Sequence, residues 1–165
     1  MKKIIRKLIN IRRNLNRNPE LSQFEFMTSN YIKKIISKYM PDEIITDLAY
    51  NSKAFVFYGK DRSKNIIFRA ELDALSINEI NDFEYKSIYD NISHKCGHDG
   101  HMTCLIGLAN RINKYRNNLK NNITLLFQSA EENGAGAKQI INSIAYKKLN
   151  PSFIFALHNI PNYPK

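Results

Sequence analysis

Unbroken apolar segments that alternate with amphipathic ones limit the possible folds of this chain more than any other feature of its sequence. NNITLLFQSA (121–130) and SFIFALH (152–158) have the apolar content of buried strands, and NIIFRAEL (65–72) is similar. Residues 102–115 return to helical spacing, and a further helix is expected over 135–148. Because strands that are apolar on both faces need cover on both, the pattern predicts an α/β fold, with a largely parallel or mixed sheet flanked by helices on both faces.

Two helices are expected before the first strand. Residues 3–17 place Ile and Leu on one stripe with Lys and Arg opposite, and Asn18-Pro19 ends this helix. A second helix is expected over 23–39, with Ser22 as its N-cap. Its inner face is predicted to consist of Phe24, Met27, Tyr31, Ile35 and Ile36. A membrane-surface helix is an alternative for 3–17, but the α/β pattern that follows favours packing on a sheet.

A turn is expected at Gly59-Lys60-Asp61. These residues separate the apolar run AFVFY (54–58) from the strand over 65–72. A short glycine-containing segment between two strands predicts a β-hairpin.

Length and composition indicate one globular domain. The chain has 165 residues, of which 43% are hydrophobic and 24% are charged, an ordinary balance for a chain with a core. The basic N-terminal stretch lacks the unbroken apolar segment of a secretory signal, and two cysteines make no disulfide framework. A cytoplasmic location is therefore expected.

The net charge of +10 is unevenly distributed. Residues 1–40 hold ten Lys and Arg against two Glu, whereas residues 69–100 hold seven acidic residues against three basic ones. The acidic stretch includes Asp73 and most of the histidine-rich segment 94–101, and its negative charge suits a site that binds a cation. Since basic stripes are usually solvated helix faces, we expect no nucleic-acid partner and no membrane partner.

Polar residues follow three of the expected strands. Asp73 comes just after one strand, Glu131-Glu132 after the next, and His158 ends SFIFALH. Sites in open α/β sheets form outside the carboxyl ends of the strands. HKCGHDGH (94–101) precedes a helix, so the four segments predict one cleft.

Cys96 and His98 in HKCGHDGH have the donor atoms of a transition-metal site. Gly97 between them permits the tight loop that turns both donors to one side. A structural zinc site needs a second pair of ligands, and the sequence has none. The remaining ligands are therefore expected at the strand ends, among Glu131, Glu132 and His158.

Adjacent glutamates can divide the work of such a site. One can bind metal while its neighbour acts as general base toward a water whose pKa the metal lowers toward about 7. Glu131-Glu132 could instead be a charge pair at a helix N-terminus, and His158 could be a hydrogen-bonded residue at a strand end.

The roles of several nearby residues have two possible interpretations. His94 and His101 could orient a ligand or cap the loop, and Asp73 could be a turn residue or the carboxylate that orients a ligating histidine. Cys104 has the position of a buried cysteine on a helix face.

Four stretches resemble, in order and spacing, the M20 metallopeptidase/amidohydrolase family. They are RAELDALSINE (69–79), HKCGHDGHMTCLIGLA (94–109), LLFQSAEENGAGA (125–137) and FALHNIP (155–161). The most similar branch is that of the N-acyl-amino-acid amidohydrolases, which includes hippurate hydrolase.

The resemblance implies two divalent metal ions, zinc or manganese, and a water that they activate. It assigns Cys96, His98, Glu132 and His158 as metal ligands and Glu131 as the general base. The supporting residues are Asp73, His94, Asp99 and His101. The implied reaction is hydrolysis of the amide bond of a small-molecule N-acyl amino acid.

Members of this family are much longer than 165 residues, because they insert a lid or dimerisation domain and then complete the catalytic domain with a further histidine ligand. Residues 1–165 are thus expected to be the N-terminal part of a catalytic domain. Such a fragment is expected to have impaired activity or none, and to need a C-terminal half or a homo-oligomer. The alternative is an inactive module that binds a metal or a partner.

Overall fold

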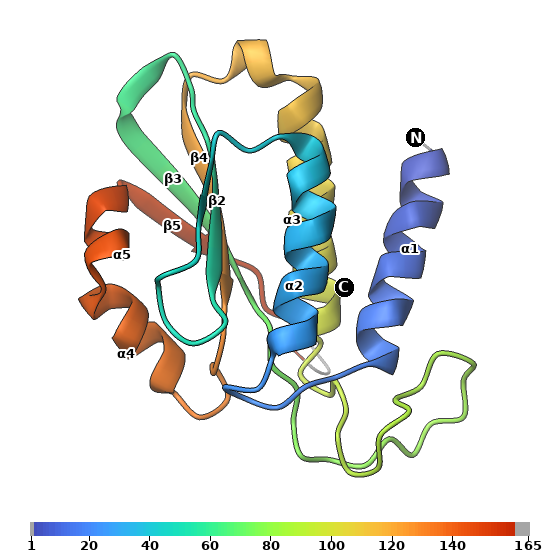
Figure 1. Ribbon diagram of the computed structural model, residues 1–165. Helices are drawn as coiled ribbons and strands as arrows, with labels where there is room; N and C mark the ends of the chain where they lie inside the picture. The colour runs from blue at the N-terminus through green and yellow to red at the C-terminus, as the bar shows by residue number, and fades with distance from the viewer. Residues whose placement is uncertain (1, 161–165) are drawn as a thin grey trace.

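The computed structural model describes residues 2–160, which form one sheet flanked by helices (Figure 1). The helices are α1 (Lys2–Arg17), α2 (Phe26–Ile36), α3 (His98–Lys114), α4 (Ala135–Asn142) and α5 (Ile144–Leu149), with the 3₁₀ turns η1 (Ser37–Tyr39) and η2 (Arg116–Asn118). The strands are β1 (Glu43–Ile45), β2 (Lys53–Phe57), β3 (Asp61–Glu71), β4 (Asn121–Gln128) and β5 (Phe153–Ala156).

The strands lie in the order β1-β2-β4-β3-β5. β3 is parallel to both β4 and β5, whereas β2 is antiparallel to β4 and β1 is antiparallel to β2. The expected α/β fold is therefore confirmed, with a mixed sheet. β1 was not among the expected strands.

The expected hairpin between β2 and β3 is wrong, because β4 lies between these two strands. Gly59 passes over the start of β4, and an added Cβ there would lie 2.4 Å from the carbonyl oxygen of Asn121. Lys60 and Asp61 donate backbone hydrogen bonds to Leu119 and Lys120. The glycine thus permits a close crossing of a third strand, and the more apolar β4 takes the buried central position.

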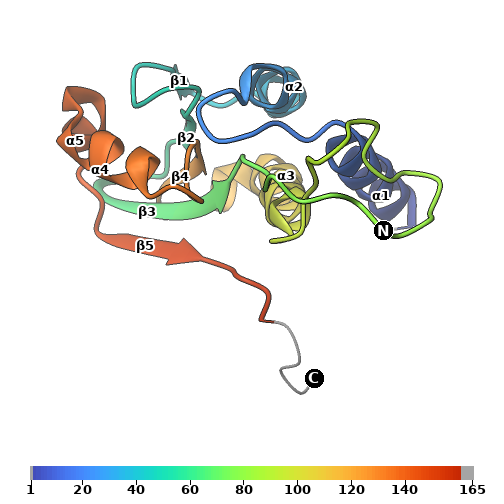
Figure 2. The same ribbon diagram turned by 90° about the horizontal axis from the view of Figure 1, so that it is seen from below.

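Two groups of side chains cover the two faces of β2, β3 and β4. Figure 2 shows α2 and α3 beside one face and α4 and α5 beside the other. One core cluster joins strand residues such as Phe55, Leu125 and Phe127 to the first three helices. The other joins Ala54 and Leu126 to α4 and α5. Strand residues alternate between the clusters, so the prediction of a sheet covered on both faces is confirmed for these strands.

β5 differs from its prediction as a buried strand. All four of its residues are exposed, and it forms the outer edge of the sheet (Figure 2). Phe155 stacks on Phe68 of β3, with ring centroids 5.6 Å apart. Exposed apolar side chains on an open edge strand are the features of a surface that another segment covers.

The first two helices differ from expectation in their packing. α1 packs mainly against α3 rather than directly on the sheet. α2 begins at Phe26 and is shorter than expected, and Phe24 and Met27 are exposed rather than internal. Ser22 does not cap α2, because its hydroxyl donates to Asp73 instead. Among residues 2–160 no helix combines the length and apolar character needed to cross a membrane.

The later helices also depart from their expected limits. α3 begins at His98, which places His98 and His101 of HKCGHDGH in its first turn. The single helix expected over 135–148 is divided at Ser143, whose hydroxyl oxygen accepts from the Tyr146 amide and caps α5. Cys104 is exposed, contrary to expectation, because it lies on the outer side of α3.

Candidate metal centre

The carboxyl ends of the three parallel strands and the first turn of α3 meet at one edge of the sheet. Glu131-Glu132 follow β4 and His158 follows β5, and both segments approach His98. Among residues 2–160, three groups of side chains have donor atoms within 4.8 Å of one another, and the groups share His98. The groups are Cys96, His98 and His158; His98, Glu131 and Glu132; and Glu71, His98 and His101. The strand ends and the start of α3 therefore bring together Cys96, His98, Glu131, Glu132 and His158 of the predicted cleft, and they add Glu71, which was not predicted.

His98 is fully buried and has one ring nitrogen directed at carboxylates. Its Nδ1 lies 2.8 Å from the carbonyl oxygen of Asp73, so Nδ1–H donates there. Nε2 lies 3.7 Å from a carboxylate oxygen of Glu131 and 3.7 Å from one of Glu132. A lone pair on Nε2 that faces two carboxylates is repulsive unless a proton or a cation lies between them.

The unpaired atoms at this point fit a metal ion. His98 Nε2 and Glu132 Oε1 are buried and have no hydrogen-bond partner among the residues that the structure describes. Burial lowers the pKa of His98, but Asp73 and the charge of Glu71 outweigh it, so the pKa is raised overall. A divalent cation satisfies the same nitrogen and carboxylates with ligands that it prefers.

Cys96 adds a thiol to this group. Gly97 has φ 85°, a left-handed conformation that places Cys96 just before α3. The Sγ of Cys96 lies 3.4 Å from Nε2 of the exposed His158. Burial, a hydrogen bond with Glu132 and the charges of the neighbouring carboxylates raise the pKa of Cys96 to about 12. The thiol is therefore protonated at neutral pH until a cation offsets these charges.

Metal affinity is expected to rise steeply with pH. Because the raised pKa of Cys96 keeps its thiol protonated, a bound metal must displace that proton. Each proton released makes the apparent affinity about tenfold tighter per pH unit below that pKa. Titration with Cd²⁺ at pH 6, 7 and 8, with the thiolate absorption as signal, measures the slope. An affinity that does not change over this range would contradict thiolate ligation.

Asp73 holds two parts of the site together. Its Oδ2 accepts from the Ser22 hydroxyl at 2.7 Å and from the backbone N–H of Glu132 at 3.0 Å. Its Oδ1 lies 3.5 Å from Nδ1 of His98. Burial raises the pKa of Asp73, but its bonds to His98, Glu132 and Ser22 outweigh this and lower it. These contacts favour the interpretation of Asp73 as a carboxylate that orients His98, rather than as a turn residue.

Glu131 and Glu132 lie in a turn between β4 and α4. Ala130 before them has φ 54°, a left-handed conformation that costs a residue with a Cβ about 1–2 kcal/mol. The first turn of α4 contains no acidic residue. The glutamates therefore do not form a charge pair there, and their carboxylates face His98 instead.

His101 lies between a buried carboxylate and the segment after β5. Its Nδ1 is 2.9 Å from Glu71 and its Nε2 is 2.9 Å from Oδ1 of Asn159. Glu71 also pairs with Arg69. Burial raises the pKa of Glu71, but the bond to His101 and the charge of Arg69 outweigh it and lower the pKa. Because Asn159 follows His158, His101 contacts the segment that carries a candidate ligand.

Asp99 and His94 lie behind the loop. Asp99 is fully buried and accepts from Arg12 and from Asn16, each at 3.1 Å, which ties α1 to the start of α3. Burial lowers the pKa of His94 to about 4, so its ring is neutral. Neither nitrogen of His94 has a hydrogen-bond partner among residues 2–160. These contacts support a role of Asp99 in shaping the loop, and His94 belongs to none of the three candidate ligand groups.

Three residues that contact the site or the turn before Glu131 were not predicted from the sequence. They are Glu71, Asn159 and Glu25, and Glu25 accepts a hydrogen bond from the backbone N–H of Ala130. Glu71 was detectable in principle, since a carboxylate at the end of the apolar strand NIIFRAEL needs a buried partner. Asn159 and Glu25 have no comparable signal, because their partners lie 58 and 105 residues away.

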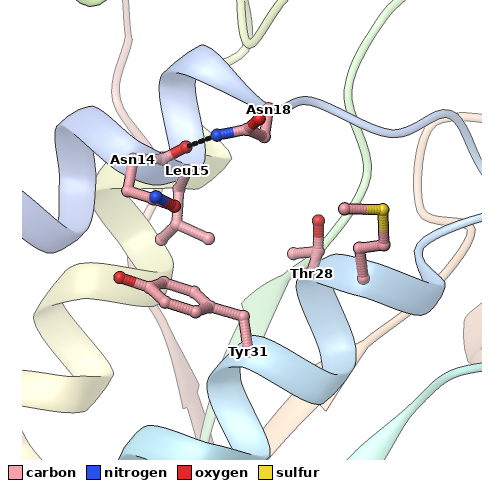
Figure 3. Close-up of a pocket in the computed structure, with 6 residues that line it drawn as sticks. Asn14, Leu15, Asn18, Thr28 and Tyr31 are labelled. Carbon is pink, nitrogen blue, oxygen red and sulfur yellow. Dashed lines mark hydrogen bonds between the residues drawn. The ribbon is translucent and has the colours of Figure 1, made fainter.

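A hollow between α1 and α2 lies apart from this centre. It has a volume of about 260 Å³ and is lined by Asn14, Leu15, Asn18, Met27, Thr28 and Tyr31 (Figure 3). None of the candidate ligands contributes to it. This hollow is therefore not part of the candidate metal centre.

Comparison with known proteins identifies the family. Residues 67–165 match the peptidase family M20/M25/M40. This match includes Cys96, His98, the glutamate pair and His158. The chain belongs to this family. The resemblance of its four sequence stretches to M20 proteins is therefore confirmed.

Relatives of this M20 chain are similar along nearly all of its length. It is 36% identical to an N-acetyldiaminopimelate deacetylase of Bacillus subtilis (strain 168), over 97% of this chain and 42% of that protein. The solved structure of the Bacillus subtilis YXEP protein, described as a dinuclear metal binding peptidase from the M20 family, matches with a TM-score of 0.91. That match has 34% identity and covers 99% of this chain and 46% of the other.

A third match supports the same fold. A putative aminohydrolase from methicillin-resistant Staphylococcus aureus has a TM-score of 0.89 and 26% identity, over 98% of this M20 chain and 42% of its own. The chain thus spans less than half the length of each of these three proteins.

Proposed function

We propose that the protein hydrolyses the amide bond of an N-acyl amino acid in a metal-dependent reaction. The observation that carries the proposal is the placement of Nε2 of buried His98 opposite the carboxylates of Glu131 and Glu132, each at 3.7 Å. The thiol of Cys96 and the ring of His158 adjoin the same point. Nitrogen, oxygen and sulfur donors around one fully buried imidazole are a ligand set for a divalent cation.

Cys96, His98, Glu132 and His158 are the proposed ligands of two divalent ions, zinc or manganese. Three candidate groups that share His98 give more donors than one ion needs. When bound, such ions lower the pKa of a water and polarise a carbonyl oxygen. The similar Bacillus subtilis structure is described as a dinuclear metal binding peptidase, which supports the number of ions.

Glu131 is the proposed general base. Its side chain is partly exposed, whereas that of His98 is fully buried, so Glu131 can reach a substrate that approaches from solvent. It accepts the proton of the attacking water and delivers it to the leaving amine. Asp73, His101 and Asp99 support the ligands through the contacts described above, and His94 is a supporting residue by its place in the loop.

The substrate and the setting are proposals for the whole protein. A small N-acyl amino acid is suggested by the name of the deacetylase to which the chain is 36% identical. We assign residues 1–165 to the N-terminal part of a catalytic domain, in a cytoplasmic aminoacylase-like enzyme. By itself this part is proposed to have impaired activity. The exposed β5 favours, as the second candidate, an inactive module that binds a partner.

Metal analysis and a hydrolysis assay test the proposal together. Purified protein is analysed for zinc and manganese, then assayed on N-acetyl and N-benzoyl amino acids before and after chelation. Hydrolysis that is lost on chelation and restored by Zn²⁺ or Mn²⁺ is the expected result. Metal binding without hydrolysis by the whole protein favours the second candidate, and protein that binds neither ion contradicts both.

A further inference from the structure

Glu25 is a fully buried carboxylate that the proposed reaction does not use. It lies just before α2. One oxygen accepts from the backbone N–H of Ala130 at 2.8 Å and the other from the side-chain amide of Asn51 at 3.3 Å. Both donors are neutral, although a buried carboxylate without a cation is costly. Its contacts therefore need an explanation other than an ion pair.

The contact with Ala130 is made at the turn that leads to the glutamate pair. Ala130 is fully buried and has φ 54°. Its N–H is held by Glu25 and its carbonyl oxygen accepts from the N–H of Gly136 at 2.9 Å. Because the left-handed conformation is unfavourable for alanine, the turn depends on these two hydrogen bonds to keep Ala130 in that conformation.

Both ends of the glutamate segment are held by carboxylates. Glu25 binds the amide just before Glu131, and Asp73 binds the amide of Glu132. Asp73 also contacts the ring of His98. The direction of the Glu131 and Glu132 side chains is therefore set from two sides, one of them α2.

We propose that Glu25 is a positioning residue that fixes the turn at Ala130 and so directs Glu131 and Glu132 toward the metal centre. The inference rests on the proposed function. Glu25 has a rigid support, because Ile32 and Ile36 of α2 are fully buried in the core. Ser52 and Asn51 hold the preceding residue, Ser129, whereas the contact with Ala130 belongs to Glu25.

Two conservative substitutions separate geometry from charge. Glu25→Gln keeps the length and one oxygen that can accept from Ala130. Glu25→Asp keeps the charge but withdraws the carboxylate by one methylene. We expect Glu25→Asp to weaken Cd²⁺ binding about 10- to 100-fold and Glu25→Gln to weaken it less than about tenfold. Binding is followed by the Cd–thiolate absorption, with Cys96→Ser as the blank, and needs no turnover.

A double variant tests whether Glu25 acts through the proposed ligand. In a Glu132→Ala background the effect of Glu25→Asp on Cd²⁺ binding is expected to largely disappear, because Glu25 influences the metal through the position of the Glu132 carboxylate. Thr28→Val is the matched control, since Thr28 is a buried polar residue of α2 whose hydroxyl has no hydrogen-bond partner among the described residues. It should bind Cd²⁺ like the wild type.

The results distinguish this inference from the proposed function. Wild-type protein without a Cys96-dependent signal overturns the metal centre and the role of Glu25 with it. Wild-type protein that binds Cd²⁺ while Glu25→Asp binds equally well overturns the role of Glu25 alone. Weaker Cd²⁺ binding by Glu25→Gln than by Glu25→Asp also overturns this role, because it indicates that the charge of Glu25 matters more than its geometry. Additive losses of affinity in the double variant overturn it as well, because they indicate an effect on stability that does not act through Glu132.

Discussion

Glu131→Gln is expected to lower kcat for N-acyl amino acid hydrolysis about 10²- to 10⁴-fold, the contribution of a well-placed general base. Glutamine has nearly the same shape and keeps an oxygen toward His98, but it does not accept the proton of water. Metal content and the KM of the substrate are expected to change little, because Glu131 is not among the proposed ligands. The assay measures kcat, KM and bound metal for the whole protein.

Glu84→Gln is the matched control for Glu131→Gln, since Glu84 is an exposed carboxylate outside the site. It is expected to leave kcat unchanged. If Glu131→Gln retains full kcat at unchanged metal content, Glu131 is not the base. If it loses both kcat and metal, Glu131 is a ligand and the roles of the two glutamates are reversed.

Removal of the His98 imidazole is expected to have the largest effect on metal binding. His98 belongs to all three candidate groups and is fully buried. His98→Ala therefore removes a donor that every group shares, and its loss of affinity should exceed the about 10- to 100-fold typical of residues that only support a ligand. Titration with Zn²⁺ or Cd²⁺ against a competing chelator measures this loss.

The two cysteines provide a matched pair for the same measurement. Cys96→Ser is expected to weaken Cd²⁺ binding strongly and to abolish the thiolate absorption. Cys104→Ser is expected to do neither, because Cys104 is exposed on α3 and belongs to none of the candidate groups. Equal effects of the two substitutions, or a His98→Ala variant that folds and binds as tightly as the wild type, would refute the assigned centre.

Much of the candidate site could be predicted because its parts are short and local. Cys96, Gly97 and His98 are consecutive, and Glu131 and Glu132 are adjacent. Such spacing is readable without a fold. The expectation that strand ends deliver them to one place also needed only the rule for parallel strands, which β3, β4 and β5 obey.

Predictions that depended on a choice among partners were less successful. The hairpin expected at Gly59 required β2 to pair with β3, but β4 lies between them and pairs with both. Phe24 and Cys104 were assigned to the interior by helical spacing, which does not say which side a neighbour will cover. Ser22 was assigned to a helix cap, although Asp73, 51 residues away, is its partner.

The sequence by itself determined the α/β class, the covered central strands and the local clusters of metal-binding side chains, because periodicity and adjacent residues act over a few positions. Only the tertiary structure decided that β4 separates β2 from β3, that His98 faces both glutamates, and that Glu25 binds the amide of Ala130 105 residues away. The physical reason is that such contacts depend on strand order and helix placement, which are set by the packing of the whole core. They produce no periodic pattern of residues in the sequence.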